Sequence, residues 1–489
     1  MIRGLSTVLV TVCLAALACV CAGWLSAAAS AAGSHLPVGA LASAGGPVDP
    51  APPPLNDLLG TAAREATLDL STGLGALGAL PTARETAAFA AGRVAVGVVF
   101  VESDGWRTAS SESWSLEDPR WPGQDRRRLV LGQVRDALDW WNARSPDGSL
   151  ELFLPETGTY GSPRTLATGY EPIQMAIEYG YGGKKSVLSD APWRWEVMGR
   201  LGFGHDVSDD KPMPERLYAD RLRSRTGADW AFVLYVVDSL RDADGRFRND
   251  MFAYTADLFG PYMVLTYDND GYGFANFGAV MAHEMGHVFG ALDEYEPPNA
   301  GYPSTGNLAS GYLGILNSNA VRGGTTNLPC IMRGSNATLS AFKRGQLCPS
   351  TIGQAGLRDS DLDSRPDVVD TSPRLTLGAP VANPDGGLQV IGSVRERPWP
   401  RGRITKGVYF HRDISILVPH DLVYRLDGGA WQPLAAADGA FDEPSERWLL
   451  TLGSLVEGEH LLEVQATTGG AAGASKVLAV GPPVGSGAK

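Results

Sequence analysis

The chain has 489 residues, of which 41 are Lys or Arg and 54 are Asp or Glu, so the formal net charge is −13. Apolar residues make up 44% of the sequence and charged residues 19%, which is typical of a globular protein and excludes a disordered or collagen-like chain. At about 100–200 residues per domain, the length suggests two to four domains. The acidic balance, without clusters of Lys or Arg, argues against binding to nucleic acid, which needs a basic surface.

Residues 1–32 have the features of a secretory signal peptide. Arg3 precedes an apolar run from Leu5 to Ala22, and the small residues at 27–31 resemble a cleavage site. The alternative is an uncleaved anchor that would associate the protein with the cell envelope, because the apolar run approaches the length of a membrane span. In both cases we expect the rest of the chain to be secreted or extracytoplasmic.

Residues 33–92 are rich in Pro, Gly and Ala, and we expect them to be a linker or a pro-segment. Clear patterns of strands and helices begin after this stretch. Three apolar runs then predict buried strands, at 94–100, 231–237 and 262–267. Over 126–142, apolar residues recur at three- and four-residue spacing behind Asp125 as a candidate N-cap, which predicts an amphipathic helix. Strands alternating with helices indicate an α+β or α/β-like domain, which we assign to residues 93–357.

The stretch 277–295 carries the residues of a candidate metal centre. His283 and His287 are four residues apart, so on a helix both imidazoles share one face and can reach one metal ion. Glu284 lies one position further round the helix, where its carboxylate could take a proton from a metal-bound water. The alternative is a core helix with two buried histidines and no metal.

The residues after this helix favour the metal. Gly290 can end the helix in a left-handed conformation and turn the chain back. That return would bring Asp293 to the metal as a third ligand and leave the fourth position for water. Two imidazoles and a carboxylate suit Zn²⁺, which lowers the pKa of a bound water to about 7.

The same stretch resembles the metzincin clan of zinc endopeptidases, whose motif HExxHxxGxx is followed by His or Asp. The matching residues are His283-Glu284-x-x-His287-x-x-Gly290-x-x-Asp293. The Asp-Glu-Tyr at 293–295 also looks like the secreted bacterial peptidases of the IgA-peptidase type. The resemblance implies a zinc metallopeptidase domain with His283, His287 and Asp293 as ligands and Glu284 as the general base.

The resemblance also implies a methionine turn beneath the metal, for which Met332 is the candidate. Some metzincins carry a tyrosine two residues after that methionine, but position 334 is Gly in this chain. Three tyrosines stay open as replacements: Tyr295, Tyr302 and Tyr312. Metzincins place an antiparallel edge strand beside the cleft, where substrate adds as a further strand, and residues 260–267 would suit that position. An ordinary inner strand is the alternative there.

Cysteine usage predicts one disulfide. Only Cys330 and Cys348 lie outside the export segment, and they form an even pair in an oxidising compartment. Two unlinked, buried thiols are the alternative.

An acidic stretch, residues 358–372, is a second candidate metal site. Its carboxylates occupy positions 1, 3, 5, 9 and 12 of a twelve-residue loop, the spacing of a calcium loop: Asp359, Asp361, Asp363, Asp367 and Asp370. The stretch also resembles the aspartate-rich calcium repeats of thrombospondin type. Ser364 stands where Gly is expected and Pro366 stiffens the loop, so a solvated acidic linker is the alternative to Ca²⁺.

Residues 373–489 have an all-β character. Short apolar runs at 414–418 and 461–464 are separated by turns, and Asp427-Gly428-Gly429 is a hairpin turn signal. No helical periodicity is present, so we expect an Ig-like β-sandwich.

Together these features predict a secreted, zinc-dependent endopeptidase that acts on a protein or peptide substrate. Its metzincin-like domain would be followed by the Ig-like sandwich. Two other functions stay open: another HExxH metallohydrolase, such as an aminopeptidase, and a non-catalytic surface-binding or adhesion protein with a structural metal helix. Glu284 speaks against the last, because a structural metal site needs no base. Nothing in the sequence indicates an oligomeric state.

Overall fold

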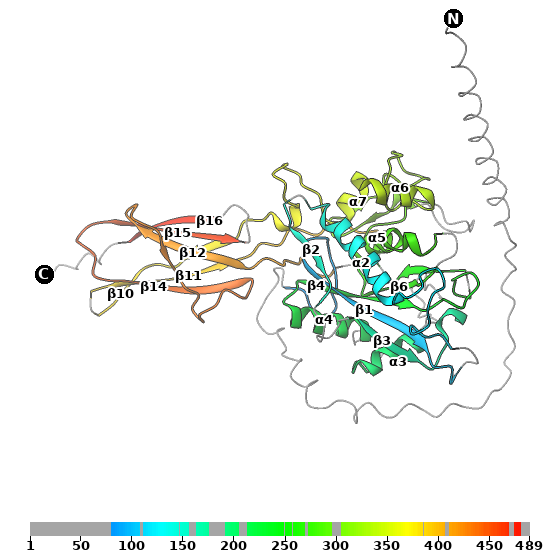
Figure 1. Cartoon of the computed structure of the whole chain (residues 1–489). Coiled ribbons are helices and arrows are strands. Elements are labelled where there is room, and N and C mark those ends of the chain that lie inside the picture. Colours follow the sequence, from blue (N-terminus) through cyan, green and yellow to red (C-terminus); the bar gives the residue numbers. More distant parts are fainter. Residues whose placement is uncertain are drawn as a thin grey trace, which may run out of the picture. The chain divides into compact units, whose positions relative to one another are not determined.

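The computed structural model describes residues 80–480 except 108–110, 146, 156–162, 176–190, 205–212, 249, 257, 269–271, 296–304, 385, 406–409 and 469–473. These residues form a part with a mixed sheet and helices, here called the α/β part, and a part made of strands alone, the all-β part (Figure 1). The expected signal peptide lies outside the described residues. Within them, no helix has the length and apolar character needed to cross a membrane.

A six-stranded sheet forms the centre of the α/β part. Its strand order is β2 (Leu150–Phe153), β1 (Gly92–Ser103), β4 (Trp230–Val237), β6 (Tyr262–Thr266) and β5 (Ala253–Thr255), with β3 (Arg164–Thr168) paired to the second half of β1. The pairs of β1 with β2, β3 and β4 and of β4 with β6 are parallel, whereas β5 is antiparallel to β6. β4 is buried along its whole length, as expected for a strand with both faces covered.

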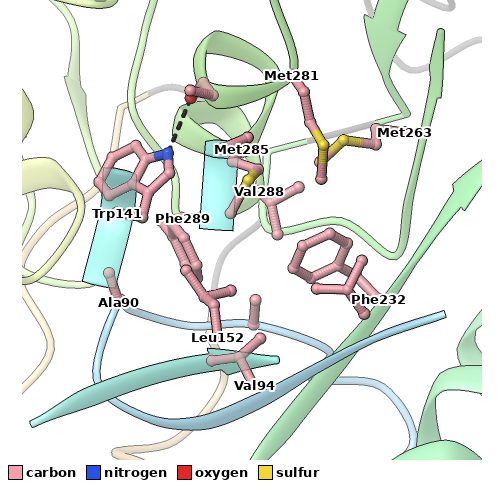
Figure 2. Packing of buried hydrophobic residues seen from close by; sticks show 14 of the residues in the cluster. Ala90, Val94, Trp141, Leu152, Phe232, Met263, Met281, Met285, Val288 and Phe289 are labelled. Atoms are coloured by element: carbon pink, nitrogen blue, oxygen red, sulfur yellow. Dashed lines mark hydrogen bonds between the residues drawn. The ribbon is translucent and has the colours of Figure 1, made fainter. Parts of the chain in front are cut away.

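Helices cover both faces of this sheet. One core contains alternate residues of β1 and β4 together with α2 (Arg126–Asn142) and α5 (Phe277–Val288). The residues in between face a second core with α3 (Ala191–Arg200) and α4 (Pro214–Thr226). The indole Nε1 of Trp141 on α2 donates to the carbonyl oxygen of Ala282 on α5 at 2.9 Å, which ties the two helices together (Figure 2).

Sequence periodicity located these main elements correctly. The three expected strands fall in β1, β4 and β6, and the expected helix is α2. The Asp125 side chain accepts a hydrogen bond from the backbone N–H of Arg127, so the expected N-cap is confirmed. The α/β part also contains several shorter elements: η3 (Pro172–Gln174), η4 (Phe274–Asn276), η5 (Thr305–Asn307), β7 (Ala309–Ser310), β8 (Ile315–Leu316), α6 (Asn336–Arg344), α7 (Pro349–Gln354) and η6 (Asp367–Val369).

The end of the expected linker belongs to the core, so its boundary at residue 92 is wrong. Residues 87–91 are fully buried. The ring of Phe89 lies 5.2 Å from that of Trp230 and 5.3 Å from that of Tyr312. Alanine is common in closely packed segments and in linkers, so the amino-acid composition did not distinguish a buried segment from a linker here.

The strand expected at the edge of the sheet lies inside it. β6 is flanked by β4 on one side and by β5 on the other, so the inner-strand alternative holds for residues 260–267. Among the described strands, the outermost one on this side of the sheet is β5, which packs beside α5. With only three residues, β5 has no apolar run long enough to be recognised in the sequence.

The all-β part consists of two four-stranded antiparallel sheets that share one hydrophobic core around Trp448. One sheet has the order β10 (Val381–Ala382), β11 (Leu388–Arg395) and β14 (Ser445–Leu452), with β9 (Arg374–Leu377) also on β11. The other has the order β13 (Gln432–Pro433), β12 (Pro419–Leu426), β15 (His460–Thr468) and β16 (Ala474–Val480). The expected turn connects β12 to β13, with left-handed φ angles of 51° at Asp427 and 70° at Gly428.

The segment between β11 and β12 packs into the core of the α/β part, and this corrects the expected domain boundary. Ile404, Phe410 and Ile414 belong to that core. The ring of Phe410 lies 4.7 Å from that of Phe259. The apolar run at 414–418, expected as a sandwich strand, packs against the α/β part instead, with Ile414 buried and Ile416 and Leu417 partly buried.

Candidate metal centre

The two histidines of α5 and Asp293 converge on one point. The Nε2 atoms of His283 and His287 lie 3.2 and 3.3 Å from Oδ1 of Asp293. All three candidate ligand atoms lie within 4.8 Å of one another. These are the three residues that we predicted from the sequence as metal ligands, and the fold brings them together.

Backbone carbonyl groups hold both imidazole rings in place. Nδ1 of His283 lies 2.9 Å from the oxygen of Ile331, and Nδ1 of His287 lies 2.8 Å from the oxygen of Ala291. A carbonyl oxygen can only accept, so each Nδ1 carries a proton when the imidazole is neutral. The lone pair of each Nε2 then faces Asp293, which is the tautomer that a metal ligand needs.

Gly290 directs the chain from the helix to Asp293. Its φ of 87° is left-handed, as expected for a residue that ends a helix. A Cβ here would collide with the ring of Phe259 and would lie 2.9 Å from the Cα of Gly311. Both the conformation and the available space therefore require glycine.

The electrostatics of the three residues fit a bound cation. Oδ1 of Asp293 is buried and has no hydrogen-bond partner among the described residues, an arrangement that is costly unless a cation completes it. Burial alone would raise the pKa of Asp293, but the two imidazoles hold it well below its usual range. Burial lowers the pKa of His287, but the Asp293 carboxylate outweighs this and raises it to about 9. The site thus favours a positive charge beside Asp293, which a bound cation would supply in place of a proton on Nε2. Two imidazoles and one carboxylate form the donor set of an open zinc site.

Glu284 is held beside the ligands by the edge strand. The hydroxyl oxygen of Thr255 on β5 lies 2.9 Å from Oε2 of Glu284 and 2.9 Å from its backbone oxygen. Both side chains are buried. Sequence reasoning missed Thr255, because it lies 29 residues before Glu284 on a three-residue strand and belongs to no motif.

Met332 is buried against the underside of α5. Its Sδ occupies the space where a Cβ of Gly286 would be. The backbone N–H of Glu294 donates to the oxygen of Met332 at 3.0 Å. The methionine is thus linked both to the histidine helix and to the residue after Asp293, and its role as a methionine turn stays a prediction.

Of the three candidate tyrosines, Tyr295 lies at the metal centre. Its ring is 6.0 Å from that of His283, and the neighbouring Asp293 carboxylate, together with burial, raises the pKa of the tyrosine hydroxyl. A Cβ on Gly334 would lie 3.1 Å from this ring, so the glycine leaves room for it. The hydroxyl of Tyr312 instead donates to the oxygen of Trp399 at 2.8 Å, and Tyr302 lies outside the described residues.

The expected disulfide is absent: Cys330 and Cys348 are two free, buried thiols, as in the alternative. The thiol of Cys348 donates to Oε1 of Glu294 at 2.7 Å, and Sγ of Cys330 lies 3.1 Å from the hydroxyl oxygen of Thr351. Each sulfur therefore has a polar partner within the core. Burial, together with the neighbouring Cys348, raises the pKa of Glu294 to about 8.

The acidic stretch brings three of its five expected calcium ligands together. Carboxylate oxygens of Asp359, Asp361 and Asp363 lie within 4.8 Å of one another. Asp370 is not part of this group. Asp367 also lies outside it, because its carboxylate accepts hydrogen bonds from Nε of Arg358 at 2.6 Å and from the backbone N–H of Ser360 at 2.8 Å.

Two residues of this loop have a left-handed backbone conformation. Ser364, at the position where Gly was expected, has a left-handed φ of 77°, and Leu362 has one of 65°. Their N–H groups donate to the carboxylate of Asp359 at 2.9 and 2.7 Å. Calcium binding stays a prediction, now with three ligands in place of five.

Comparison with known proteins finds slight likenesses to solved structures, among them those of OgpA. No protein-family model and no curated protein matches the chain. Three crystal structures of OgpA from Akkermansia muciniphila align at 11% identity: the wild-type protein in two crystal forms, with TM-scores of 0.25 and 0.23, and a catalytically inactive form in complex with an O-glycopeptide, at 0.24. The alignments cover 82–83% of this chain and 96% of OgpA. At these TM-scores the likeness does not establish a shared fold.

Proposed function

We propose that the protein is a secreted, zinc-dependent endopeptidase with His283, His287 and Asp293 as metal ligands. The observation that carries this proposal is the buried Oδ1 of Asp293, which faces two imidazole Nε2 atoms and has no hydrogen-bond partner among the described residues. A bound Zn²⁺ would supply a Lewis acid for the scissile carbonyl and a water with its pKa lowered to about 7. The ligand set leaves one position open for that water.

Glu284 is the general base of this proposal. Its carboxylate accepts the proton of the attacking water and returns it to the leaving amine. The helix places it next to His283, and the Thr255 hydroxyl fixes its Oε2 at 2.9 Å. Tyr295 lies beside the ligands, with its ring 6.0 Å from that of His283, and in this proposal its phenol orients the Asp293 carboxylate.

The substrate of this proposal is an extended peptide. The edge strand β5 is paired with β6 on one side only in the described sheet and lies beside α5. A peptide can add to such an edge through main-chain hydrogen bonds. This favours an endopeptidase over an aminopeptidase, because no free amino terminus is needed for strand pairing.

Residues 1–32 support export, by secretion or with an anchor in the envelope. The all-β part would serve as an Ig-like module that binds substrate or a surface, or as a spacer. A non-catalytic adhesion protein is less well supported, because its metal helix would have no use for a buried, hydrogen-bonded glutamate beside the ligands.

The test is to purify the exported chain and Glu284→Ala and to measure their metal content and their cleavage of casein and of peptides blocked at both ends. One zinc per chain in both proteins, with cleavage of blocked peptides by the unaltered chain alone, is the expected result. Cleavage restricted to peptides with a free amino terminus would favour the aminopeptidase. Zinc without proteolysis would favour the structural helix, and a chain without zinc would overturn the proposal.

A further inference from the structure

The edge strand β5 and the helix α5 meet at the side chain of Thr255. Its hydroxyl oxygen lies 2.9 Å from Oε2 and 2.9 Å from the backbone oxygen of Glu284. Thr255 is 6% exposed and Glu284 7%, so water competes little for this contact. A hydroxyl has a single proton and can donate to one of these oxygens at a time. The charged carboxylate is the stronger acceptor of the two.

The main chain of Thr255 faces away from β6, toward the edge of the sheet that the described strands form. In the β5–β6 pair, the N–H of Ala256 donates to the oxygen of Tyr262 at 3.1 Å, and the N–H of Thr266 donates to the oxygen of Phe252 at 3.0 Å. Residues of an antiparallel strand direct their main-chain groups alternately to the partner and away from it. The N–H and C=O groups of Thr255, like those of Ala253, are therefore directed away from β6.

We propose that Thr255 is a positioning residue that joins substrate binding to the general base. Its main-chain N–H and C=O groups pair with the substrate strand, and its hydroxyl holds the Glu284 carboxylate. This inference rests on the proposed function, because it takes Glu284 as the base and β5 as the substrate edge. One residue then sets both the register of the peptide and the place of the carboxylate that activates the water.

The hydroxyl can be removed with little change of shape by Thr255→Val, whereas Thr255→Ser keeps the hydroxyl. Because the main chain is unchanged in both variants, peptide binding should be preserved. We expect Thr255→Val to lower kcat about tenfold, a fraction of what a general base supplies, and to leave KM within about twofold. Thr255→Ser should recover kcat to within about threefold of the unaltered chain.

Thr266→Val is the matched control. Thr266 lies in the neighbouring strand β6, and its hydroxyl contacts the backbone oxygen of Phe252 at 3.4 Å. The same substitution is thus made in the same sheet, away from Glu284. Its kcat should equal that of the unaltered chain.

Two readouts do not depend on turnover. Zinc content and Tm of Thr255→Val should match those of the unaltered chain, which separates positioning from loss of metal or of folding. In a Glu284→Ala background, a peptide from casein that is blocked at both ends and fluorescently labelled should bind with the same Kd whether residue 255 is Thr or Val. N-methylation of the peptide amides, one at a time, should weaken binding at alternate positions if the peptide pairs with β5.

The outcomes separate this inference from the proposed function. Unaltered kcat in Thr255→Val, with Glu284→Ala inactive, would overturn the role of Thr255 and leave the peptidase in place. A loss of kcat accompanied by loss of zinc or a lower Tm, or not recovered in Thr255→Ser, would assign the residue a merely structural role. Full activity of Glu284→Ala would overturn the proposed function itself.

Discussion

Nδ1 of His283 hydrogen-bonds to the backbone oxygen of Ile331 at 2.9 Å, and Ile331 is the residue before Met332. The loop beneath α5 thereby sets which nitrogen of the imidazole faces Asp293. His287 is fixed in the same way by the oxygen of Ala291. The metal centre is therefore shaped by two loops that follow the helix as well as by the spacing along the helix itself.

Asp293→Asn should reduce zinc affinity by about 100-fold or more, because the anionic ligand is replaced by a neutral amide. The measurement is competition for zinc with a chelator of known affinity. Asp136→Asn, on the exposed face of α2, is the matched control and should keep the affinity of the unaltered chain. Equal affinities for all three proteins would show that the zinc is held elsewhere.

The local parts of this centre could be predicted from the sequence. On any helix, the spacing of His283 and His287 places both imidazoles on one face, with Glu284 next to them. Gly290 and Asp293 follow within six residues of His287, so their positions also depend on local structure. Thr255 could not be found in this way, because the fold, and no motif, brings β5 beside α5. The same holds for Asp367, whose spacing suits a calcium loop but whose carboxylate is taken by Arg358.

The same contrast holds for the fold: single strands could be predicted from the sequence, but their pairing and packing could not. Long apolar runs located β1, β4 and β6, but pairing with the short β5 decided that β6 is an inner strand. The segment around Phe410 was assigned to the sandwich because its neighbours in sequence are strands. Its burial against Phe259 depends on tertiary packing that composition does not record.

Glu396 should make stability depend on pH. It is 3% exposed, neither carboxylate oxygen has a hydrogen-bond partner among the described residues, and burial raises its pKa to about 8. The folded state therefore holds a proton that the unfolded state releases near pH 4.5, so the free energy of unfolding falls as the pH rises from about 4.5 to 8.

Glu396→Gln removes this titration. We expect it to change stability little at pH 5 and to raise the free energy of unfolding by about 1–3 kcal/mol at pH 8, measured by chemical denaturation. Glu459→Gln, at an exposed site, is the control and should have no effect at either pH. A gain from Glu396→Gln that is the same at pH 5 and pH 8 would contradict the assignment.

Calcium should stabilise the zinc-loaded protein if Asp359, Asp361 and Asp363 bind it. Addition of millimolar Ca²⁺ is then expected to raise Tm by a few degrees, because the ion binds the folded state alone. Asp361→Asn should abolish the increase, whereas Asp367→Asn should lower Tm with and without calcium, since its carboxylate bonds to Arg358 and Ser360. An equal increase in Asp361→Asn would remove this loop as the site.

Gly290→Ala should damage folding and metal binding together. The alanine would have to adopt a left-handed φ of 87°, which costs about 1–2 kcal/mol, and its Cβ would collide with the ring of Phe259. We expect a loss of about 2–4 kcal/mol in unfolding free energy and weaker zinc binding, because the strain is relieved by moving the chain that carries Asp293.

Gly132→Ala provides the matched control for this substitution. Gly132 lies within α2 and a Cβ there would meet no atom within 4 Å, so alanine should stabilise the helix by about 0.5–1 kcal/mol. Chemical denaturation and chelator competition on both variants separate the two effects. If Gly290→Ala lost stability but kept full zinc affinity, the turn would be needed for the fold but not for the placement of Asp293 as a ligand.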